Sequence, residues 1–362
     1  MKSMPYFGRE KRERKRFGLG IVGGSGYGAG ELLRMLSLHP EIEACSVTSR
    51  AHAGNPVSSV HSHLENVCGL SFESSVSLER LQEYERSAVV LAMPSGQAVS
   101  AAEGLLRDGL PNSACLVDLS GDLRLRNPEE HACFYPEVEF AKDLRSRFVY
   151  GLTELDRAAI AKARFITNPG CLASAAILAL WPLKGLATTG QTIIDAKTGT
   201  SGAGREPQPS MHHPGRFGDF TAYKALQHRH EPEILQALGD TLLRENGFMF
   251  VPHLIPVSRG IFVSAYVTLA ADTSVEAIRQ RYEAAFEGSP LIRFRAAPPR
   301  LVDVVGTNFC DISFALRGKQ LVVMAALDNL GKGMVGAALQ NLNLMFGLPE
   351  TTGLLHASVG PA

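Results

Sequence analysis

A cysteine stands between an Asn-Pro-Gly turn and a long apolar run in "FITNPGCLASAAILALWPL", residues 165–183. Asn168 precedes a proline and favours extended backbone, and Gly170 can take a positive φ, so Cys171 is expected in the first turn of a helix. The free N–H groups at a helix start stabilise a thiolate by about 0.3 to 1 kcal/mol, which favours a reactive nucleophile. The alternative is a small hydrophobe packed inside a buried helix.

Two histidines, His228 and His230, occur in the segment "QHRHEPEIL". Pro232 suits the first position of a helix, so residues 228–230 are predicted to be extended. Residues two apart then share a face, and one imidazole can serve as acid and base while the other holds substrate. A surface pair, or a metal clip with His212 and His213, is the alternative. No cysteine or carboxylate falls at zinc-type spacing, so no metal is predicted.

A glycine-rich turn occurs in "GLGIVGGSGYGAGELLRMLSLHP", between a strand at 18–22 and a helix at 29–38. Such a turn lets a pyrophosphate approach the backbone N–H groups of a helix start, although a merely structural turn is the alternative. The next strand, 42–48, is followed by Ser49 and Arg50 instead of the acidic residue typical of NAD sites, so we predict NADP. The loop "KTGTSGAGREP", 197–207, is suited to wrapping phosphates or a nicotinamide amide, or is a plain surface loop.

Short apolar strands alternate with helical patterns up to Cys171, which predicts an α/β Rossmann-type NADP-binding domain with a parallel sheet. Strands rich in β-branched residues then surround helices at 231–243 and 274–286, which predicts an α+β substrate and dimerisation domain with a mostly antiparallel sheet. A last helix at 333–346 is expected to pack back on the first domain. We therefore predict an NADP-binding domain of 17–168 and 333–362, a catalytic domain of 169–332, and a basic disordered extension of 1–16.

The composition excludes several classes of protein. The 362 residues carry 36 basic and 36 acidic side chains, so no global charge recruits nucleic acid or a membrane surface. The exception is residues 2–16, with seven basic and two acidic residues, which we interpret as a solvated extension. Six scattered cysteines without a C-x-x-C pair fit reduced thiols, so we predict a cytoplasmic protein.

The combination of motifs resembles N-acetyl-gamma-glutamyl-phosphate reductase, a family of the aspartate-semialdehyde dehydrogenase-like superfamily. The resemblance extends from Gly18 to Leu348, and the motifs occur in the family's order. They are "GGSGYGAGELLRMLSLHP", "DLSGDLRL" (118–125), "YGLTEL" (150–155), "NPGC" (168–171), "TSGAGR" (200–205), "HRHEPEI" (228–234), "PHLIPVSRGI" (252–261), "GTNFCDI" (306–312) and "LDNLGKG" leading to "QNLNLMFGL" (327–348).

The resemblance implies NADPH-dependent reduction of N-acetyl-L-glutamyl 5-phosphate to N-acetyl-L-glutamate 5-semialdehyde in arginine biosynthesis, with release of phosphate. By this resemblance, Cys171 matches the nucleophile. His230, with His228 beside it, matches the histidine pair of the substrate site. We expect Arg124, Lys197 and Arg259 to hold the substrate's phosphate or carboxylates. A homodimer or homotetramer through the second domain's sheet is also implied. The positions that match the family's NADP site are Ser25, Gly26, Tyr27, Gly28, Ser49, Arg50, Pro94, Ser120, Ser201, Gly202, Ala203, Gly204 and Asn329.

The chain departs from the family's usual pattern at three places. Leu172-Ala173-Ser174 follows the cysteine where Tyr-Pro-Thr is common, Ser95 replaces the histidine of "LPHG", and Gly28-Ala29 replaces Thr-Gly. The second hypothesis is therefore the same chemistry on another N-blocked glutamyl or aminoadipyl phosphate. A third is an NADP-binding protein that has lost catalysis, although the intact cysteine and histidines argue against it.

Overall fold

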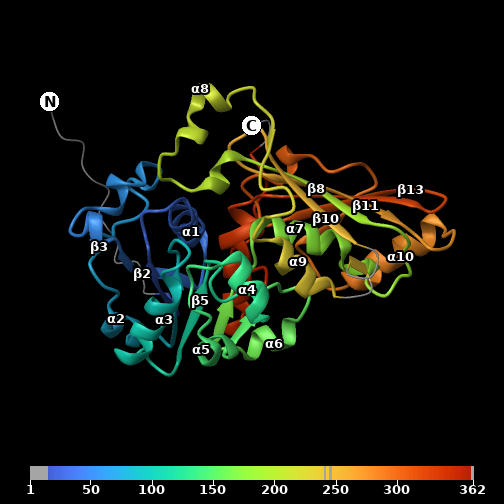
Figure 1. Cartoon of the computed structure of the whole chain (residues 1–362). Helices are drawn as coiled ribbons and strands as arrows, with labels where there is room; N and C mark the ends of the chain where they lie inside the picture. Colours follow the sequence, from blue (N-terminus) through green and yellow to red (C-terminus); the bar gives the residue numbers. More distant parts are fainter. Residues whose placement is uncertain (1–14, 240–241, 244–246, 360–362) are drawn as a thin grey trace.

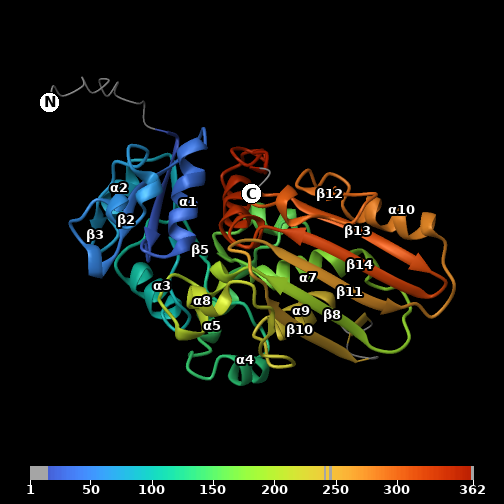
Figure 2. The ribbon, with the colours of Figure 1, turned by 90° about the horizontal axis from the view of Figure 1, so that it is seen from above.

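Two sheets of seven strands each lie side by side along the molecule (Figures 1 and 2). The computed structural model describes residues 15–239, 242–243 and 247–359, so nearly all of the predicted basic extension lies outside the described residues. Each sheet has its own hydrophobic core, and the reactive segment of the chain lies where the two meet.

The first sheet is entirely parallel, with the strand order β3-β2-β1-β4-β5-β7-β6. Its central strands are buried on both faces, as their continuous apolar sequences require. The order reverses between β1 and β4, which is where ligands bind in doubly wound folds. The strands are β1 (Phe17–Val22), β2 (Ile42–Thr48), β3 (Phe72–Glu73), β4 (Arg86–Leu91), β5 (Ala114–Asp118), β6 (Phe148–Tyr150) and β7 (Phe165–Thr167). The helices are α1 (Tyr27–Leu38), α2 (Leu78–Gln82), α3 (Ala98–Arg107), α4 (Pro128–Phe134), α5 (Lys142–Ser146) and α6 (Arg157–Lys162).

The second sheet is mixed, with the order β12-β13-β14-β11-β8-β10-β9. Four of its six strand pairings are antiparallel, so the predicted α+β domain with a mostly antiparallel sheet is confirmed. The strands are β8 (Thr192–Thr198), β9 (Thr221–Ala222), β10 (Phe248–Leu254), β11 (Ile261–Thr268), β12 (Ile292–Phe294), β13 (Cys310–Arg317) and β14 (Gln320–Leu327). The helices are α7 (Cys171–Leu180), α8 (His213–Arg216), α9 (Glu231–Leu238) and α10 (Val275–Ala285).

Helices α7, α9 and α10 lie on one face of the second sheet (Figure 1). After its first residue, α7 is buried over its whole length, which explains why its sequence is apolar on every side. Helix α9 ends at Leu238 and not at residue 243 as predicted, because Gly239 has φ +75° and terminates it. Cys171 therefore begins the central helix of the second domain, directly after the last segment of the first.

The chain returns to the first domain at its end. A π-helix, Gly331–Val335, leads into α11 (Gly336–Met345), whose Leu339 and Leu342 belong to the core of the first domain. The predicted helix at 333–346 is thus present, with a π-turn at its start. The domain division at residues 168 and 333 stays a prediction, which this packing supports.

Candidate active site

The Asn-Pro-Gly turn delivers Cys171 to the first position of α7. The Asn168 N–H donates to the Asp118 carbonyl at 2.7 Å, which ties the turn to the carboxyl end of β5. Gly170 caps the helix with φ −70°, so the positive φ considered from the sequence is wrong. The glycine is required for another reason: a Cβ at this position would lie 2.3 Å from Nε2 of His230. The turn therefore leaves room for an imidazole directly beside the cysteine.

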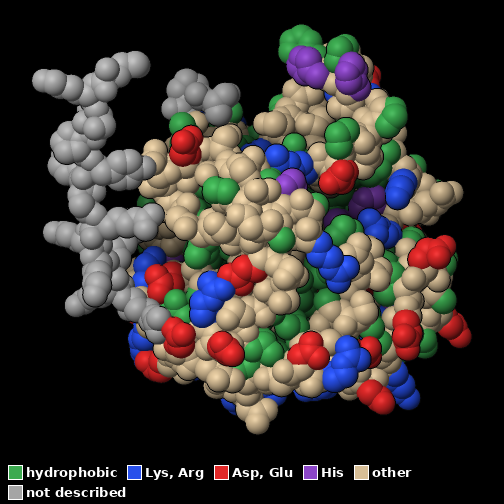
Figure 3. Space-filling model, turned by 90° about the vertical axis from the view of Figure 1, so that its left-hand side faces the viewer, with side chains coloured by type: hydrophobic (Ala, Val, Ile, Leu, Met, Phe, Trp, Pro, Cys, Tyr) green, Lys and Arg blue, Asp and Glu red, His purple; other side chains and the backbone are tan. Residues whose placement is uncertain are grey.

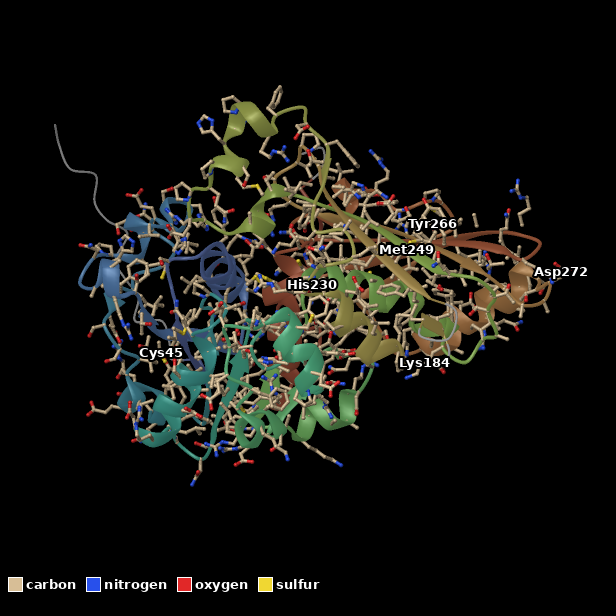
Figure 4. All side chains as sticks on the ribbon, in the orientation of Figure 1. Cys45, Lys184, His230, Met249, Tyr266 and Asp272 are labelled. Atoms are coloured by element: carbon tan, nitrogen blue, oxygen red, sulfur yellow. The ribbon has the colours of Figure 1, made fainter. Side chains whose placement is uncertain are left out.

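The histidine pair meets in a way that the sequence does not predict. Residues 228–230 form a turn, closed by the Glu231 N–H donating to the His228 carbonyl at 2.9 Å, so the predicted extended conformation is wrong. The two rings nevertheless meet edge to face with 4.6 Å between centroids. The His230 N–H donates to Nδ1 of His228 at 3.1 Å, and His228 packs against Tyr223 and Phe250. His230 lies at the centre of the molecule, between the two domains (Figure 4).

Glu233 connects the cysteine turn to the histidine turn. Its Oε1 accepts hydrogen bonds from the Gly170 N–H and the Tyr150 hydroxyl, both at 2.7 Å. Its Oε2 lies 3.5 Å from the guanidinium of Arg124, and its side chain is completely buried. Sequence reasoning missed this role, although Glu233 stands inside the "HRHEPEI" motif. A glutamate within the first turn of a helix, after two histidines, was the available signal.

Burial determines the protonation of the reacting groups. It raises the pKa of Cys171 to about 11, which the Arg124 charge and the Leu172 N–H oppose only in part. Burial also lowers the pKa of His228 to about 4 and the pKa of His230 well below its usual value. The predicted preference for a thiolate is wrong in the free site, because desolvation outweighs the 0.3 to 1 kcal/mol contributed by a helix start. In the free site the Cys171 thiol and the His230 imidazole are therefore both neutral, and the His230 ring lies against Gly170, the residue before the cysteine.

The predicted cofactor residues gather at the carboxyl edge of the first sheet. Ser25, Gly26, Tyr27 and Gly28 form the turn into α1, and a Cβ at Gly26 would meet no atom within 4 Å. This open backbone fits the close approach of a pyrophosphate. Ser49 and Arg50 follow β2, Pro94 follows β4, and Ser120 follows β5.

Two cavities adjoin this edge. One of about 510 Å³ is lined by Arg50, Met93, Gln97, Ser100 and Ala101. The other, of about 350 Å³, lies between the turn and the 199–207 loop and is lined by Ser25, His52, Ser59, Val60, Arg205, Glu206 and Pro207.

The second domain supplies the other cofactor candidates. The loop residues Ser201, Gly202, Ala203 and Gly204 follow β8 in a short 3₁₀ turn. Asn329 donates from Nδ2 to the Ser201 hydroxyl at 2.9 Å and accepts the Gly260 N–H at 2.8 Å. The structure thus brings together two predicted cofactor positions that are 128 residues apart.

The three predicted substrate cations are all engaged by the protein. Arg124 is buried, donates to the Asn168 and Leu119 carbonyls and pairs with Glu233. Arg259 pairs with Glu31 of α1 at 2.8 Å and with Asp328 at 2.7 Å. The segment that leads into β11 is thereby joined to helix α1. The charge of each of these two guanidinium groups is therefore compensated by a carboxylate of the protein.

Lys197 lies elsewhere. It pairs with Asp195 at 2.6 Å, on the face of β8 opposite to the buried Ile194 and Ala196. Because side chains alternate along a strand, this is the face turned away from α7. The structure therefore does not bring Lys197 to Cys171.

Among the described residues, no group of three or more His, Cys, Asp or Glu side chains could hold a metal ion. His212 and His213 are exposed at the start of α8, which projects at the top of the molecule (Figure 1). In Figure 3, histidine and hydrophobic side chains lie together on a projection at the top of the molecule. No described helix is long and apolar enough to cross a membrane.

Known proteins resemble the chain over nearly its whole length. The model of the semialdehyde dehydrogenase NAD binding domain matches residues 18–163, and that of the semialdehyde dehydrogenase dimerisation domain matches residues 171–329. N-acetyl-gamma-glutamyl-phosphate reductase of Methanosarcina barkeri is 41% identical over 94% of this chain and 99% of the relative. The protein of the same name from Bacillus cereus is 37% identical over 93% and 97%.

A solved structure has the same fold. Aspartate semialdehyde dehydrogenase II of Vibrio cholerae superimposes with a TM-score of 0.64 at 14% identity, covering 92% of this chain and 99% of that one. The Rossmann-type domain and the mixed-sheet domain are therefore those of semialdehyde dehydrogenases.

Proposed function

Because the chain belongs to the family of N-acetyl-gamma-glutamyl-phosphate reductases, we propose that it performs that reaction at Cys171. It is an NADP-dependent oxidoreductase that reduces N-acetyl-L-glutamyl 5-phosphate to N-acetyl-L-glutamate 5-semialdehyde, releasing phosphate, in arginine biosynthesis. One observation carries the residue assignment: Cys171 begins a buried helix with the neutral His230 ring directly against Gly170.

The thiol and the imidazole perform the covalent steps. His230 takes the Cys171 proton, and the thiolate attacks the acyl carbon. The carbon–oxygen bond to phosphate then breaks, and phosphate leaves with the bonding electrons. The residues of the glycine turn and of the 201–204 loop would hold NADPH, which would supply the hydride for reduction of the thioester carbon. Hydride addition leaves an oxyanion, which collapses to the aldehyde as Cys171 leaves with the electrons of the carbon–sulfur bond. His230 then returns its proton to the Cys171 thiolate, and the released phosphate takes its proton from solvent.

Other residues position this pair. Glu233 and Arg124 hold the cysteine turn, so we assign Arg124 to positioning and not to direct substrate contact. His228 packs beside His230 and holds its ring. We assign NADP to the glycine turn, to Ser49, Arg50, Pro94 and Ser120, and to the 201–204 loop with Asn329. The two cavities beside these residues support the assignment.

We also propose that two copies of the chain associate through the outer face of the second sheet. That face carries Met249 and Tyr266, which lie near one another in Figure 4, and Tyr266 is 42% exposed. Its Asp195–Lys197 pair would then be covered by the partner. A cytoplasmic location is proposed because all six cysteines are free.

The decisive experiment measures phosphate-dependent NADP reduction with N-acetylglutamate 5-semialdehyde. The wild-type protein is expected to be active, Cys171→Ser to be inactive, and Cys133→Ser, which changes an exposed cysteine, to retain the wild-type rate. A Cys171→Ser variant with an undiminished rate contradicts the assignment of the nucleophile. An inactive wild type that still binds NADPH favours the other acyl phosphates, or a protein without catalysis.

Cofactor preference is tested by binding. The exposed Arg50 after β2 is suited to a 2′-phosphate, so NADPH is expected to bind more tightly than NADH. Arg50→Ala should weaken NADPH binding and leave NADH binding unchanged. Equal affinities for both cofactors in the wild-type protein would contradict the role of Arg50.

A further inference from the structure

The substrate of the proposed reaction carries a phosphoryl dianion and a carboxylate, and such groups are bound by cations with free N–H donors. Three cations expected to serve are already engaged: Arg124 by Glu233, Lys197 by Asp195, and Arg259 by Glu31 and Asp328. A different cation must therefore meet the anion beside Cys171.

Arg229 stands between the two histidines and differs from those three. Among the residues that the structure describes, it forms no ion pair with a carboxylate, and its side chain is exposed. Its Nη1 donates to the Ser95 hydroxyl at 3.0 Å, and its guanidinium carbon lies 5.5 Å from the centre of the Tyr135 ring. A guanidinium has five N–H donors, so one bond to Ser95 leaves a planar edge for a ligand.

The contacts hold this guanidinium in one place. Ser95 belongs to the loop after β4, and the next residue, Gly96, donates its N–H to both carboxylate oxygens of Asp122 at 2.9 Å. Tyr135 is buried and supplies a flat apolar surface against which the guanidinium lies. Arg229 is thus supported by the cofactor domain while its backbone belongs to the turn that carries His230.

The position favours the phosphoryl group over the carboxylate of the substrate. The phosphoryl oxygen is attached to the carbon that Cys171 attacks, whereas the carboxylate is several bonds away. Burial, and after it the charges of His228, Arg124 and Arg229, lowers the pKa of His230, so the Arg229 guanidinium lies within electrostatic range of that imidazole and is suited to the nearer anion. Arg229 is also exposed, so phosphate released beside it has access to solvent.

We propose that Arg229, oriented by Ser95 and Tyr135, binds the phosphoryl group of the acyl phosphate and the inorganic phosphate that leaves. The proposal rests on the proposed function, because it takes the substrate class from that reaction. It assigns this chain's departure at Ser95 a role: the serine hydroxyl accepts a hydrogen bond from the arginine that meets the substrate.

The test is the reverse reaction, in which inorganic phosphate is a separate substrate with its own KM. Arg229→Gln should raise the KM for phosphate by roughly 10- to 100-fold, since it removes a charge-assisted hydrogen bond. The KM for the semialdehyde should change less than about threefold, and Arg229→Lys should restore part of the phosphate affinity. Arg317→Gln, an exposed arginine on the β13–β14 hairpin that donates to Gln320, serves as the matched control and should change neither constant.

Two outcomes overturn the proposal. An unchanged KM for phosphate shows that Arg229 does not bind the phosphoryl group, and a raised KM for the semialdehyde alone assigns Arg229 to the carboxylate. A second readout is independent of turnover: inorganic phosphate should slow alkylation of Cys171 by iodoacetamide in the wild-type protein and in Arg317→Gln, but not in Arg229→Gln. Phosphate protection in a wild-type protein that does not turn over would sink the proposed function and leave the anion site standing. Equal protection of wild type and Arg229→Gln would sink the anion site.

Discussion

Replacing Glu233 tests whether one buried carboxylate holds the two halves of the catalytic pair together. The Gly170 N–H, the Tyr150 hydroxyl and the Arg124 guanidinium all meet this side chain. Glu233→Ala removes the shared acceptor and leaves Arg124, which is only 8% exposed, without its counter-charge. Burial lowers the pKa of Arg124 and the Glu233 charge raises it in the wild type. Because a guanidinium does not lose its proton in proteins, the variant holds a buried charge without its partner.

The expected cost follows from that unpaired charge. Removing one partner of a buried ion pair costs about 3 to 5 kcal/mol, against a total stability of about 5 to 15 kcal/mol for a typical domain. Glu233→Gln keeps an oxygen that can accept the Gly170 N–H and loses only the charge, so it should cost about 1 to 3 kcal/mol. Glu233→Ala should also lower kcat, because the Gly170 N–H loses the acceptor that holds the cysteine turn, and Glu233→Gln should lower it less because it keeps that acceptor.

Urea unfolding provides the measurement. The sequence contains a single tryptophan, Trp181, and it directly follows α7, so its fluorescence reports on the second domain. The unfolding midpoint should fall most for Glu233→Ala and less for Glu233→Gln. Glu283→Ala changes an exposed glutamate of α10, and its free energy of unfolding should stay within about 0.5 kcal/mol of the wild-type value. A Glu233→Ala midpoint no lower than that of Glu283→Ala would refute the reasoning.

Three further predictions concern buried titratable groups. Because burial raises the pKa of Cys171 to about 11, its alkylation by iodoacetamide in the free protein should accelerate up to about that pH, and a rate that levels off below pH 9 would contradict this. Burial lowers the pKa of His39 from 6.5 to about 4, so between these values the unfolded chain binds more protons and stability should fall on acidification, by up to ~3 kcal/mol from this residue. The fall in urea midpoint should be smaller in His39→Gln, and an identical fall would exclude the assignment. Lys332 donates to Glu154 at 2.6 Å with both side chains fully buried, so Lys332→Met should cost about 3 to 5 kcal/mol in urea unfolding. The double variant Lys332→Met with Glu154→Leu should recover much of that loss. A double variant no more stable than Lys332→Met would contradict a coupling between the two buried charges.

Local patterns were sufficient for the architecture. The glycine turn between two strands, the alternation of short apolar strands with helices, and the change in pattern after Cys171 predicted a parallel sheet followed by a mostly antiparallel one. They also placed Cys171 at a helix start, since Asn-Pro-Gly followed by an apolar run is a short-range signal. One error fell at the histidine turn, where a hydrogen bond between His228 and Glu231 replaced the expected extended chain.

The sequence by itself determined which groups can react, and the tertiary structure decided how they are held and charged. Arg259 reads as a free substrate cation until Glu31, 228 residues away, lies against it. Cys171 reads as a helix-start thiolate until the surrounding domains remove its water and raise its pKa. The physical reason is the range of each effect: backbone preferences act within a few residues, whereas desolvation and charge pairing depend on segments that only the folded chain brings together.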